Sequence, residues 1–388
     1  MGLKGTNQEF GRPYNRRIVL ETIRLHGPIA RGDIARRVGL TVQTVSNIIR
    51  ELEDMHLIAG SRDQPKGRGY PATSLMINPD GGYAVGVNVT PKGFEVALVN
   101  LAGLVVARAA GRSRSQNPGS AMREIGTLAG KLRQRHPARR VLGIGLAMPG
   151  PFDVESMSFV GPTTLEGWKG FPVQQRLAEV SGLPAFIEVD HAAAALGEQL
   201  YGAGQGFRDF YFLYFGVGLG GCMVQDGQSL RGTFGNAGEI GHLPSVAGGE
   251  LCPCGNSGCL ERYLSLEAFE RRALTIGADG WLDEVTPLLR SAVITIENLF
   301  DPETIIVGGL TEGNVMSQLL ERLEPLPNSV SQRHGRQAAR ITRAAGGPDA
   351  VLRGAASLAI AGVLSPRFGT MFAQGLARDP LLNPVKAA

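Results

Sequence analysis

The sequence predicts two parts of different fold class: an N-terminal winged helix-turn-helix, followed by a larger α/β domain. Apolar residues recur at helical spacing over the first 55 residues. From about residue 80, short apolar strands alternate with helices and end in glycine-rich loops. At 388 residues the chain is also too long for one ordinary core. We expect the first domain to span residues 1–78 and the second to span residues 79–388.

Composition places the chain among soluble globular proteins. It is 43% hydrophobic and 19% charged, which is unlike a disordered or fibrous sequence. No apolar run reaches the roughly 18 residues of a membrane span. The first 15 residues are polar and lack the apolar stretch of a signal peptide. We therefore expect a cytoplasmic protein that does not enter a membrane.

The positive charge is concentrated near the N-terminus. The first 75 residues carry 12 Lys and Arg against 7 Asp and Glu, whereas the remainder carries 27 against 28. This asymmetry is typical of a small nucleic-acid-binding module attached to a neutral body. On charge alone, a solvated basic surface without a partner is the alternative.

Three helices are predicted in the first domain. The first covers residues 16–26 and ends at Gly27-Pro28, and the second covers residues 31–38. Gly39 then makes a tight turn, and Thr41 is the expected N-cap of a third helix that runs to about residue 55. This order of helix, glycine turn and helix is typical of a helix-turn-helix.

The third helix has an apolar face and a polar face. Val45, Ile48 and Leu52 lie on one side, which leaves a set of polar side chains on the others: Gln43, Thr44, Asn47 and Arg50. Amide side chains bond adenine edges in bidentate fashion, and a guanidinium suits phosphate or guanine. We expect this helix to enter the major groove of double-stranded operator DNA. A helical bundle with an ordinary polar surface is the alternative.

A β-hairpin wing is predicted to follow. Short apolar strands around residues 57–59 and 73–76 flank a segment rich in glycine and proline that carries Arg62, Lys66 and Arg68. The Gly-Arg-Gly stretch around Arg68 is slim enough to place an arginine in a minor groove. A flexible basic linker is the alternative.

The second domain shows α/β alternation. Strands are expected at residues 83–89, 94–100, 141–148, 185–188, 210–215 and 304–307, with helices at residues 120–135 and from residue 191. Glycine loops follow two of these strands, at residues 216–221 and 308–309. Such loops at strand ends favour an α/β fold that binds its ligands there.

A metal site is predicted in the loop at about residues 238–262. The chain has four cysteines, and Cys252, Cys254 and Cys259 lie close to His242 in the pattern H-x9-C-x-C-x4-C. One imidazole and three sulfurs complete a tetrahedral structural zinc site, and cysteines clustered in this way do not fit a secreted disulfide framework. Reduced structural cysteines are the alternative, and Cys222 is expected in the core.

Five motifs resemble those of the ROK family (repressors, ORFs and kinases), in the family's order: GLAMPGP at 145–151, DHAAAALGE at 190–198, GVGLGG at 216–221, GEIGH at 238–242 and CPCGNSGCLE at 252–261. The resemblance covers roughly residues 80–365, and the helix-turn-helix matches the family's repressor branch. It implies an actin-like, two-lobed fold with a sugar pocket in the cleft.

The resemblance also implies the pocket residues. Positions that match Glu239, His242 and Glu261 bind sugar in the family, and the aspartate that matches Asp190 is the general base of the kinases. Family kinases have Asn-Asp-x-Asn where this chain has VDHA at 189–192, so one expected sugar contact is lost. Buried structural carboxylates are the alternative for Glu239 and Glu261.

Kinase chemistry is not expected. Family kinases begin with an Asp-x-Gly-Gly-Thr turn, whose backbone amides hold phosphates. The matching segment is NVTPK at 88–92, in which Asn88 replaces the acid, both glycines are missing and Pro91 has no N–H. We therefore assign no catalytic residue and interpret Asp190 as a vestigial base.

Taken together, these features predict a DNA-binding repressor of carbohydrate genes, rather than an activator, that responds to a sugar or sugar derivative. Reading two half-sites of an operator favours a homodimer or a dimer of dimers. A working sugar kinase that also binds DNA is the main alternative. A regulator that answers to a partner protein is another.

Overall fold

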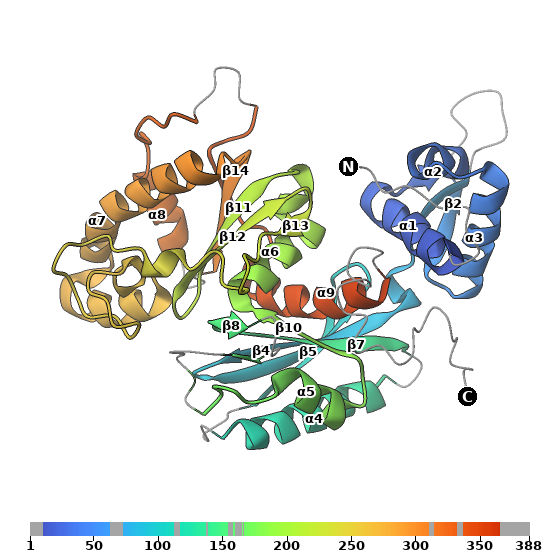
Figure 1. Ribbon diagram of the computed structural model, residues 1–388, viewed down its shortest axis with the longest axis horizontal. Coiled ribbons are helices and arrows are strands. Elements are labelled where there is room, and N and C mark those ends of the chain that lie inside the picture. Colours follow the sequence, from blue (N-terminus) through green and yellow to red (C-terminus); the bar gives the residue numbers. More distant parts are fainter. Residues whose placement is uncertain are drawn as a thin grey trace.

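The chain folds into a small N-terminal domain beside a body of two lobes (Figure 1). This computed structural model describes residues 11–62, 73–111, 117–136, 139–153, 158–159, 165, 167–309, 314–331 and 337–364. Within these residues no helix is both long and apolar enough to cross a membrane. The predicted fold class, a winged helix-turn-helix followed by a two-lobed α/β body, is confirmed.

The N-terminal domain contains three helices and a small sheet. Its helices are α1 (Gly11–His26), α2 (Arg31–Val38) and α3 (Val42–Asp54), and its strands are β1 (Ile29–Ala30), β2 (Ile58–Arg62) and β3 (Thr73–Ile77). Gly39 ends α2 in the left-handed region at φ 69°. The Thr41 hydroxyl accepts the Thr44 N–H at 3.1 Å, so the predicted N-cap of α3 is confirmed.

The predicted hairpin is also present. β2 and β3 pair antiparallel from Ile58 opposite Ile77 to Arg62 opposite Thr73, and β1 pairs with the other edge of β3. The tip of the hairpin, residues 63–72, lies outside the described residues, and with it Arg68. A 3₁₀ turn, η1 (Pro79–Gly81), then leads into the body.

The first lobe is a five-stranded sheet between two helical layers. The strand order is β10-β7-β4-β5-β6, formed by β4 (Tyr83–Thr90), β5 (Gly93–Asn100), β6 (Val105–Gly111), β7 (Val141–Met148) and β10 (Ala185–Val189). β4, β7 and β10 run parallel, and β5 and β6 are antiparallel additions. Helices α4 (Pro118–Gln134) and α5 (Val173–Ser181) cover one face, and α9 (Ala350–Leu364) covers the other (Figure 1). A two-stranded ribbon, β8 (Phe152–Asp153) with β9 (Ser158–Phe159), follows β7.

The second lobe repeats this mixed topology. Its strand order is β13-β12-β11-β14-β15, formed by β11 (Phe210–Phe215), β12 (Leu219–Gln225), β13 (Gln228–Ser229), β14 (Thr304–Gly309) and β15 (Ile341–Arg343). The long α7 (Leu266–Phe300), which is kinked at Gly277, and the short α8 (Val315–Arg322) pack beside this sheet (Figure 1). Helix α6 (Asp190–Tyr201) joins the lobes. Short 3₁₀ turns complete the chain: η2 (Ala203–Gly206), η3 (Ile240–His242), η4 (Leu260–Arg262) and η5 (Gly347–Asp349).

The segment at residues 216–221 differs from its prediction. We expected a glycine loop throughout, but only residues 216–218 turn, and Leu219 already begins β12, which pairs antiparallel with β11. Gly220 lies in this strand, where a larger residue would not fit, because a Cβ there would come 2.5 Å from His191 Nδ1. Here glycine makes room for a neighbouring side chain.

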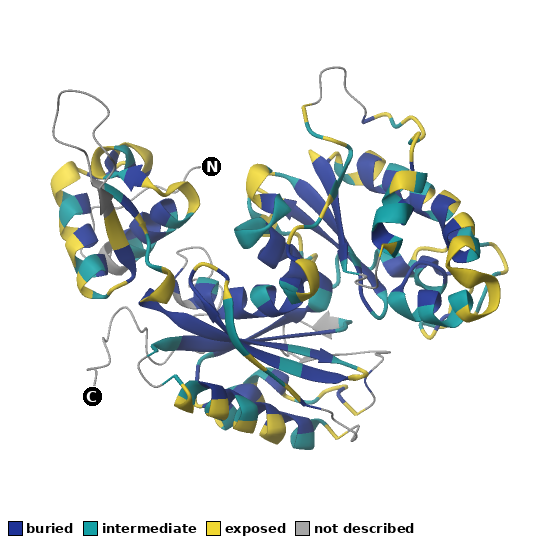
Figure 2. Cartoon of the chain, turned by 180° about the vertical axis from the view of Figure 1, so that it is seen from behind, coloured by how far each residue is buried: buried dark blue, intermediate teal, exposed yellow. Residues whose placement is uncertain are grey.

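The N-terminal domain shares a core with the first lobe. Its buried residues, including Ile18 and Leu52, form one apolar cluster with Leu142 of β7 and with Leu352 and Ala356 of α9. Figure 2 shows buried residues running through both the first lobe and the N-terminal domain. The domain is therefore packed against the body as well as joined to it through the chain.

Candidate functional site

The four predicted metal ligands come together. His242 ends η3 and the three cysteines lie on the loop before η4, and all four ligand atoms lie within 4.8 Å of one another. Cys254 Sγ is 3.6 Å from Cys259 Sγ, and Cys252 Sγ is 3.6 Å from His242 Nδ1. Tetrahedral zinc with its usual bond lengths places ligand atoms about 3.5–3.8 Å apart, whereas a disulfide needs about 2.05 Å between sulfurs. The residues present fit a metal.

One cysteine of this loop, Cys254, has a lowered thiol pKa. A hydrogen bond from the Asn256 backbone lowers the pKa of the Cys254 thiol to about 7. Burial raises the pKa of Cys252. Because the thiolate is the form that binds metal, the lowered pKa favours Cys254 as a metal ligand.

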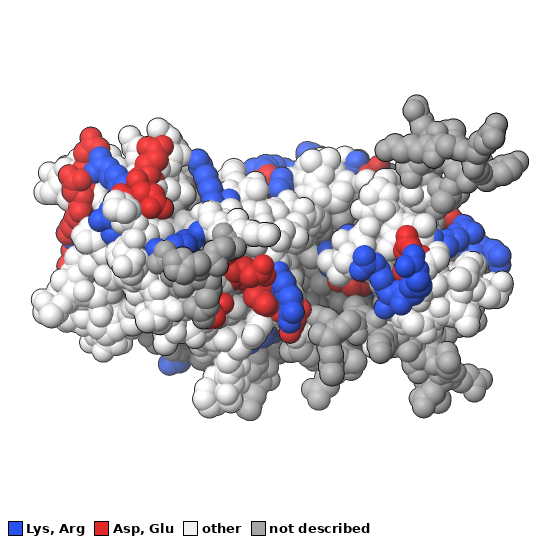
Figure 3. All heavy atoms as spheres, turned by 90° about the horizontal axis from the view of Figure 1, so that it is seen from above, with Lys and Arg blue, Asp and Glu red and all other residues white. Residues whose placement is uncertain are grey.

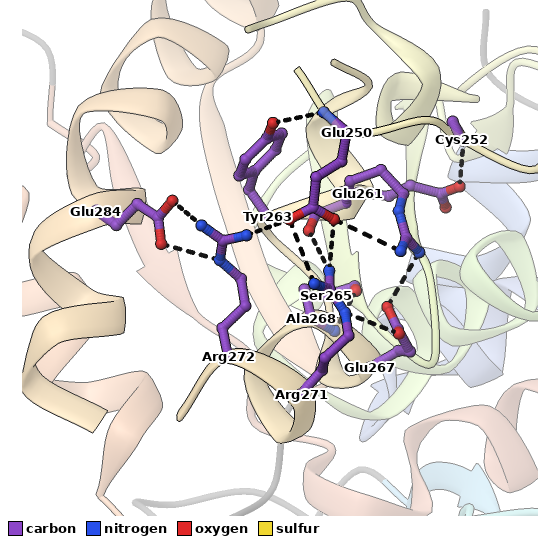
Figure 4. Close-up of polar contacts among 11 residues, drawn as sticks. Glu250, Cys252, Glu261, Tyr263, Ser265, Glu267, Ala268, Arg271, Arg272 and Glu284 are labelled. Atoms are coloured by element: carbon purple, nitrogen blue, oxygen red, sulfur yellow. Dashed lines mark hydrogen bonds and ion pairs between the residues drawn. The ribbon is translucent and has the colours of Figure 1, made fainter. Parts of the chain in front are cut away.

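The part of the metal loop just before the first cysteine is fixed to α7 by charged side chains (Figure 4). The Glu250 carboxylate accepts hydrogen bonds from Arg271, at 2.9 Å, and from Arg272. The Glu250 backbone N–H donates to the Tyr263 hydroxyl at 3.0 Å, and Arg272 also pairs with Glu284. These contacts hold the loop near α7 without involving any of the four metal ligands.

A cavity of about 170 Å³ lies beside the metal cluster, between the lobes. The first lobe contributes Pro149 and Gly150, and the second contributes Tyr214 and residues 218–220. The four residues predicted to bind effector all line it: Asp190, Glu239, His242 and Glu261. The structure thus brings together side chains that are up to 71 positions apart in the sequence.

His242 faces both the metal cluster and the cavity, through different ring nitrogens. Its Nδ1 lies 3.6 Å from Cys252 Sγ and 3.5 Å from Glu261 Oε1, whereas its Nε2 lies 3.9 Å from Glu239 Oε2. Glu261 Oε1 is also 3.2 Å from Cys252 Sγ. A metal held by Nδ1 would fix the ring and so fix where Nε2 points in the cavity.

His191 is a pocket residue that sequence reasoning did not assign. It lines the cavity, is 4% exposed, and its Nδ1 lies 3.5 Å from Asp190 Oδ1. Burial lowers the pKa of His191, but the hydrogen bond with Asp190 and the charges of Asp190, Glu239 and Glu188 outweigh this, so the net shift is upward. The signal in the sequence was a histidine within the DHA segment of a family motif. His191 therefore offers a hydrogen-bond donor among carboxylates.

The polar face of α3 is open to solvent. Gln43, Asn47 and Arg50 are exposed, and Gln43 Nε2 donates to Asn47 Oδ1 at 3.4 Å. Thr44 is half-buried, and its hydroxyl lies 2.9 Å from the Thr41 hydroxyl, so it contributes to the helix cap. Figure 3 shows Lys and Arg side chains gathered on this domain, where α2 adds three exposed arginines: Arg31, Arg36 and Arg37.

Comparisons with known families match both parts of the chain. The sequence model of the ROK family matches residues 84–361, well over half of the chain. The chain belongs to the ROK family. A winged helix-turn-helix DNA-binding model matches residues 13–59 of this ROK protein. The predicted family is therefore confirmed, together with its N-terminal DNA-binding module.

Individual relatives of this ROK protein include regulators and kinases. It is 27% identical over 363 residues to the xylose repressor of Caldicellulosiruptor bescii, covering 84% of this chain and 90% of the relative. A solved ROK family transcriptional regulator, a homologue of the Escherichia coli MLC protein, shares its fold at a TM-score of 0.74 and 24% identity, covering 93% and 98% of the two chains. A ROK glucokinase from Streptomyces griseus in complex with glucose and AMPPNP aligns at a TM-score of 0.62 and 26% identity, covering 72% and 100%.

The turn between β4 and β5 is where ROK kinases carry their phosphate loop, by the resemblance described above. In this ROK chain the Lys92 N–H donates to the Thr90 hydroxyl at 3.3 Å, and that hydroxyl donates to the Gly93 carbonyl at 3.1 Å. Lys92 Nζ lies 2.5 Å from Glu270 Oε1 of α7, so the turn is bridged to the second lobe. The Lys92 amide is therefore used within the turn, and Pro91 has no amide hydrogen to offer.

Proposed function

We propose that this ROK protein is a DNA-binding transcriptional repressor of carbohydrate genes, whose operator affinity is set by an unphosphorylated sugar in the cavity between its lobes. The observation that carries the proposal is the convergence of Asp190, Glu239 and Glu261 in one cavity of a chain that also has an exposed α3. The names of its relatives, which include xylose repressors, support it.

The charge and size of the cavity support the choice of ligand. Three carboxylates accept hydrogen bonds from hydroxyl groups and repel phosphate, while His191 supplies a donor. The cavity volume of about 170 Å³ suits a monosaccharide better than an oligosaccharide.

We further propose that Zn²⁺ is the metal held by His242, Cys252, Cys254 and Cys259. When bound, it supplies structural support and no reactive position, because four protein ligands close a tetrahedral shell. Its effect on the cavity is to orient His242 and the loop that carries Glu239 and Glu261.

The proposal includes no catalytic role. Asp190 lines the cavity as a family general base would, but the turn at Thr90–Lys92 lacks the glycines and acid of a phosphate loop, and Lys92 is paired with Glu270.

On DNA, Gln43, Asn47 and Arg50 of α3 are the proposed major-groove contacts, with Arg68 in the wing. A homodimer or dimer of dimers would then present two copies of α3 to the half-sites of an operator.

The test is thermal stability of the zinc-loaded protein with D-xylose, D-glucose, N-acetyl-D-mannosamine and their phosphates, with and without Mg-ATP. We expect one unphosphorylated sugar to raise the melting temperature, because a ligand that binds only the folded state stabilises it. A shift with Mg-ATP, followed by turnover that Asp190→Asn abolishes, would instead establish the kinase. If no sugar changes the melting temperature, control by a sugar is contradicted and control by a partner protein is favoured.

His191→Leu is predicted to weaken the binding of that sugar by about 10- to 150-fold. Leucine occupies a similar volume but donates no hydrogen bond, and a hydrogen bond with a charged group contributes about 1.5–3 kcal/mol. Isothermal titration calorimetry measures the loss. The control is His136→Gln, two residues after the end of α4 and not among the residues that line the cavity. An unchanged affinity in His191→Leu would remove His191 from the sugar site.

A further inference from the structure

A buried ion pair joins the two lobes. Glu188, near the end of β10 in the first lobe, accepts a hydrogen bond from the guanidinium of Arg231, which follows β13 in the second lobe. Their side chains are 5% and 17% exposed. Another pair that joins the lobes, Lys92 with Glu270, is 63% and 38% exposed. Water and salt therefore screen the Lys92 pair far more than they screen Glu188 and Arg231.

The burial of this pair gives it a geometric effect. A carboxylate as buried as that of Glu188 is unfavourable unless a cation and hydrogen bonds offset its loss of water. Arg231 supplies the cation at one carboxylate oxygen, and the Val189 N–H donates to the other oxygen at 3.2 Å. Such a pair adds little stability compared with two apolar side chains of similar size, but its directional contact is made at only one relative position of the partners. The pair therefore fixes where the lobes lie at this point.

Each member of the pair is connected to one carboxylate of the cavity. On the first lobe, Glu188 is two residues before Asp190. On the second lobe, Arg231 begins the segment that ends at Glu239, and the Arg231 carbonyl accepts the Ala237 N–H at 3.0 Å, so this segment folds back on itself. Asp190 and Glu239 both line the cavity. The ion pair thus links the backbone segments that carry these two carboxylates.

The backbone before Glu239 is held tightly against β12. The Gly221 N–H donates to the Gly238 carbonyl at 2.8 Å, and a Cβ on Gly238 would come 1.9 Å from the Gly221 carbonyl oxygen. Across the cavity, the contact between His191 and Gly220 limits how closely α6 can approach β12. This steric contact sets the shortest separation of the two cavity walls, and the ion pair opposes a longer one.

We propose that the Glu188–Arg231 pair sets the spacing of Asp190 and Glu239, so that both carboxylates can bond to one sugar. The inference rests on the proposed function and deepens it. Hydrogen bonds between hydroxyl groups and carboxylates have donor–acceptor distances of about 2.5–3.0 Å, so widening the cavity by about 1 Å breaks one of the two bonds. Glu188 and Arg231 are positioning residues, because neither is among the described residues that line the cavity.

The experiment compares the full-length zinc-loaded protein with Arg231→Met and with the double variant Glu188→Met/Arg231→Met. Calorimetry measures the affinity for D-xylose, D-glucose and N-acetyl-D-mannosamine, and thermal unfolding measures stability. Arg231→Met should bind the sugar that the wild type binds about 10- to 150-fold more weakly, the equivalent of one lost hydrogen bond to a charged group. It should also melt at a lower temperature, because it leaves a buried carboxylate unpaired. The double variant should regain the melting temperature without regaining the sugar affinity, whereas a pair that only stabilises the fold would regain both.

The matched control is Arg340→Met. Arg340 pairs with Glu297 of α7 at 2.6 Å, and their side chains are 14% and 1% exposed, so this variant breaks an equally buried ion pair within the second lobe. Its melting temperature should fall, but its sugar affinity should match the wild type.

The double variant decides the test even if Arg231→Met folds poorly. A double variant with the sugar affinity of the wild type would overturn the inference, as would an equal loss of affinity in Arg340→Met and Arg231→Met. A wild-type protein that binds none of the three sugars would instead count against the proposed function, and the inference would fall with it.

Discussion

Cys254→Ser is expected to lose the bound metal and to lower both the melting temperature and the sugar affinity. The remaining three ligands leave the tetrahedral site open, and structural zinc contributes apparent binding energies of about 10–16 kcal/mol in zinc-finger peptides. In Cys254→Ser the loss of folding stability should be smaller than this binding energy. The contacts of Glu250 with Arg271 and Arg272 hold the segment before the first cysteine whether or not metal is bound. Metal content by mass spectrometry, thermal unfolding and calorimetry with the effective sugar measure the three effects.

The matched control is Cys222→Ser. Cys222 is also a buried cysteine, 2% exposed, but it lies on β12 outside the metal cluster. This variant should lose some stability because it buries a hydroxyl, yet keep a full complement of zinc. Equal metal content in Cys254→Ser and the wild type would show that the four residues are not the ligands.

Asn47→Ala is expected to weaken operator binding by about 1–3 kcal/mol, or about 5- to 150-fold. The estimate assumes that the exposed amide bonds a base edge in bidentate fashion. Anisotropy titrations on the selected operator and on a scrambled duplex of equal length measure the effect. The loss should be confined to the operator.

Asn298→Ala is the matched control for Asn47→Ala, since Asn298 is an exposed asparagine on α7 of the second lobe. It should bind both duplexes like the wild type. If Asn47→Ala instead weakens binding to both duplexes equally, Asn47 contacts the DNA backbone and specifies no base.

Features that depend on short stretches of sequence were predicted well. The bounds of α2, its left-handed Gly39 and the Thr41 cap follow from residues within one or two turns of helix. The metal cluster was predictable for a similar reason, because its four ligands lie within 18 consecutive residues and form a recognisable spacing. In each case the chain itself limits how far apart the groups can lie.

Features that depend on distant contacts were not predictable in the same way. His191 and Gly220 meet in the cavity wall through a contact between α6 and β12, and Gly220 belongs to a strand that pairs with β11. The hydrogen bond from the Tyr201 hydroxyl to the Leu101 carbonyl likewise joins residues that are 100 positions apart in the sequence. The periodicity of a local sequence does not indicate which of its polar residues will contact residues from distant parts of the chain.

The uninterrupted length of α6 has a consequence for how such proteins diverge. Inserting or deleting one residue between Asp190 and Tyr201 would rotate one end of the helix relative to the other by about 100° and shift it by about 1.5 Å, which would move the Tyr201 hydroxyl away from the Leu101 carbonyl. Substitutions in the first turn, at residues 189–192, leave that register intact. Descendants of this protein can therefore change the lining of the cavity by exchanging side chains at the start of α6, whereas the number of residues in α6 must stay constant to keep the orientation of its two ends.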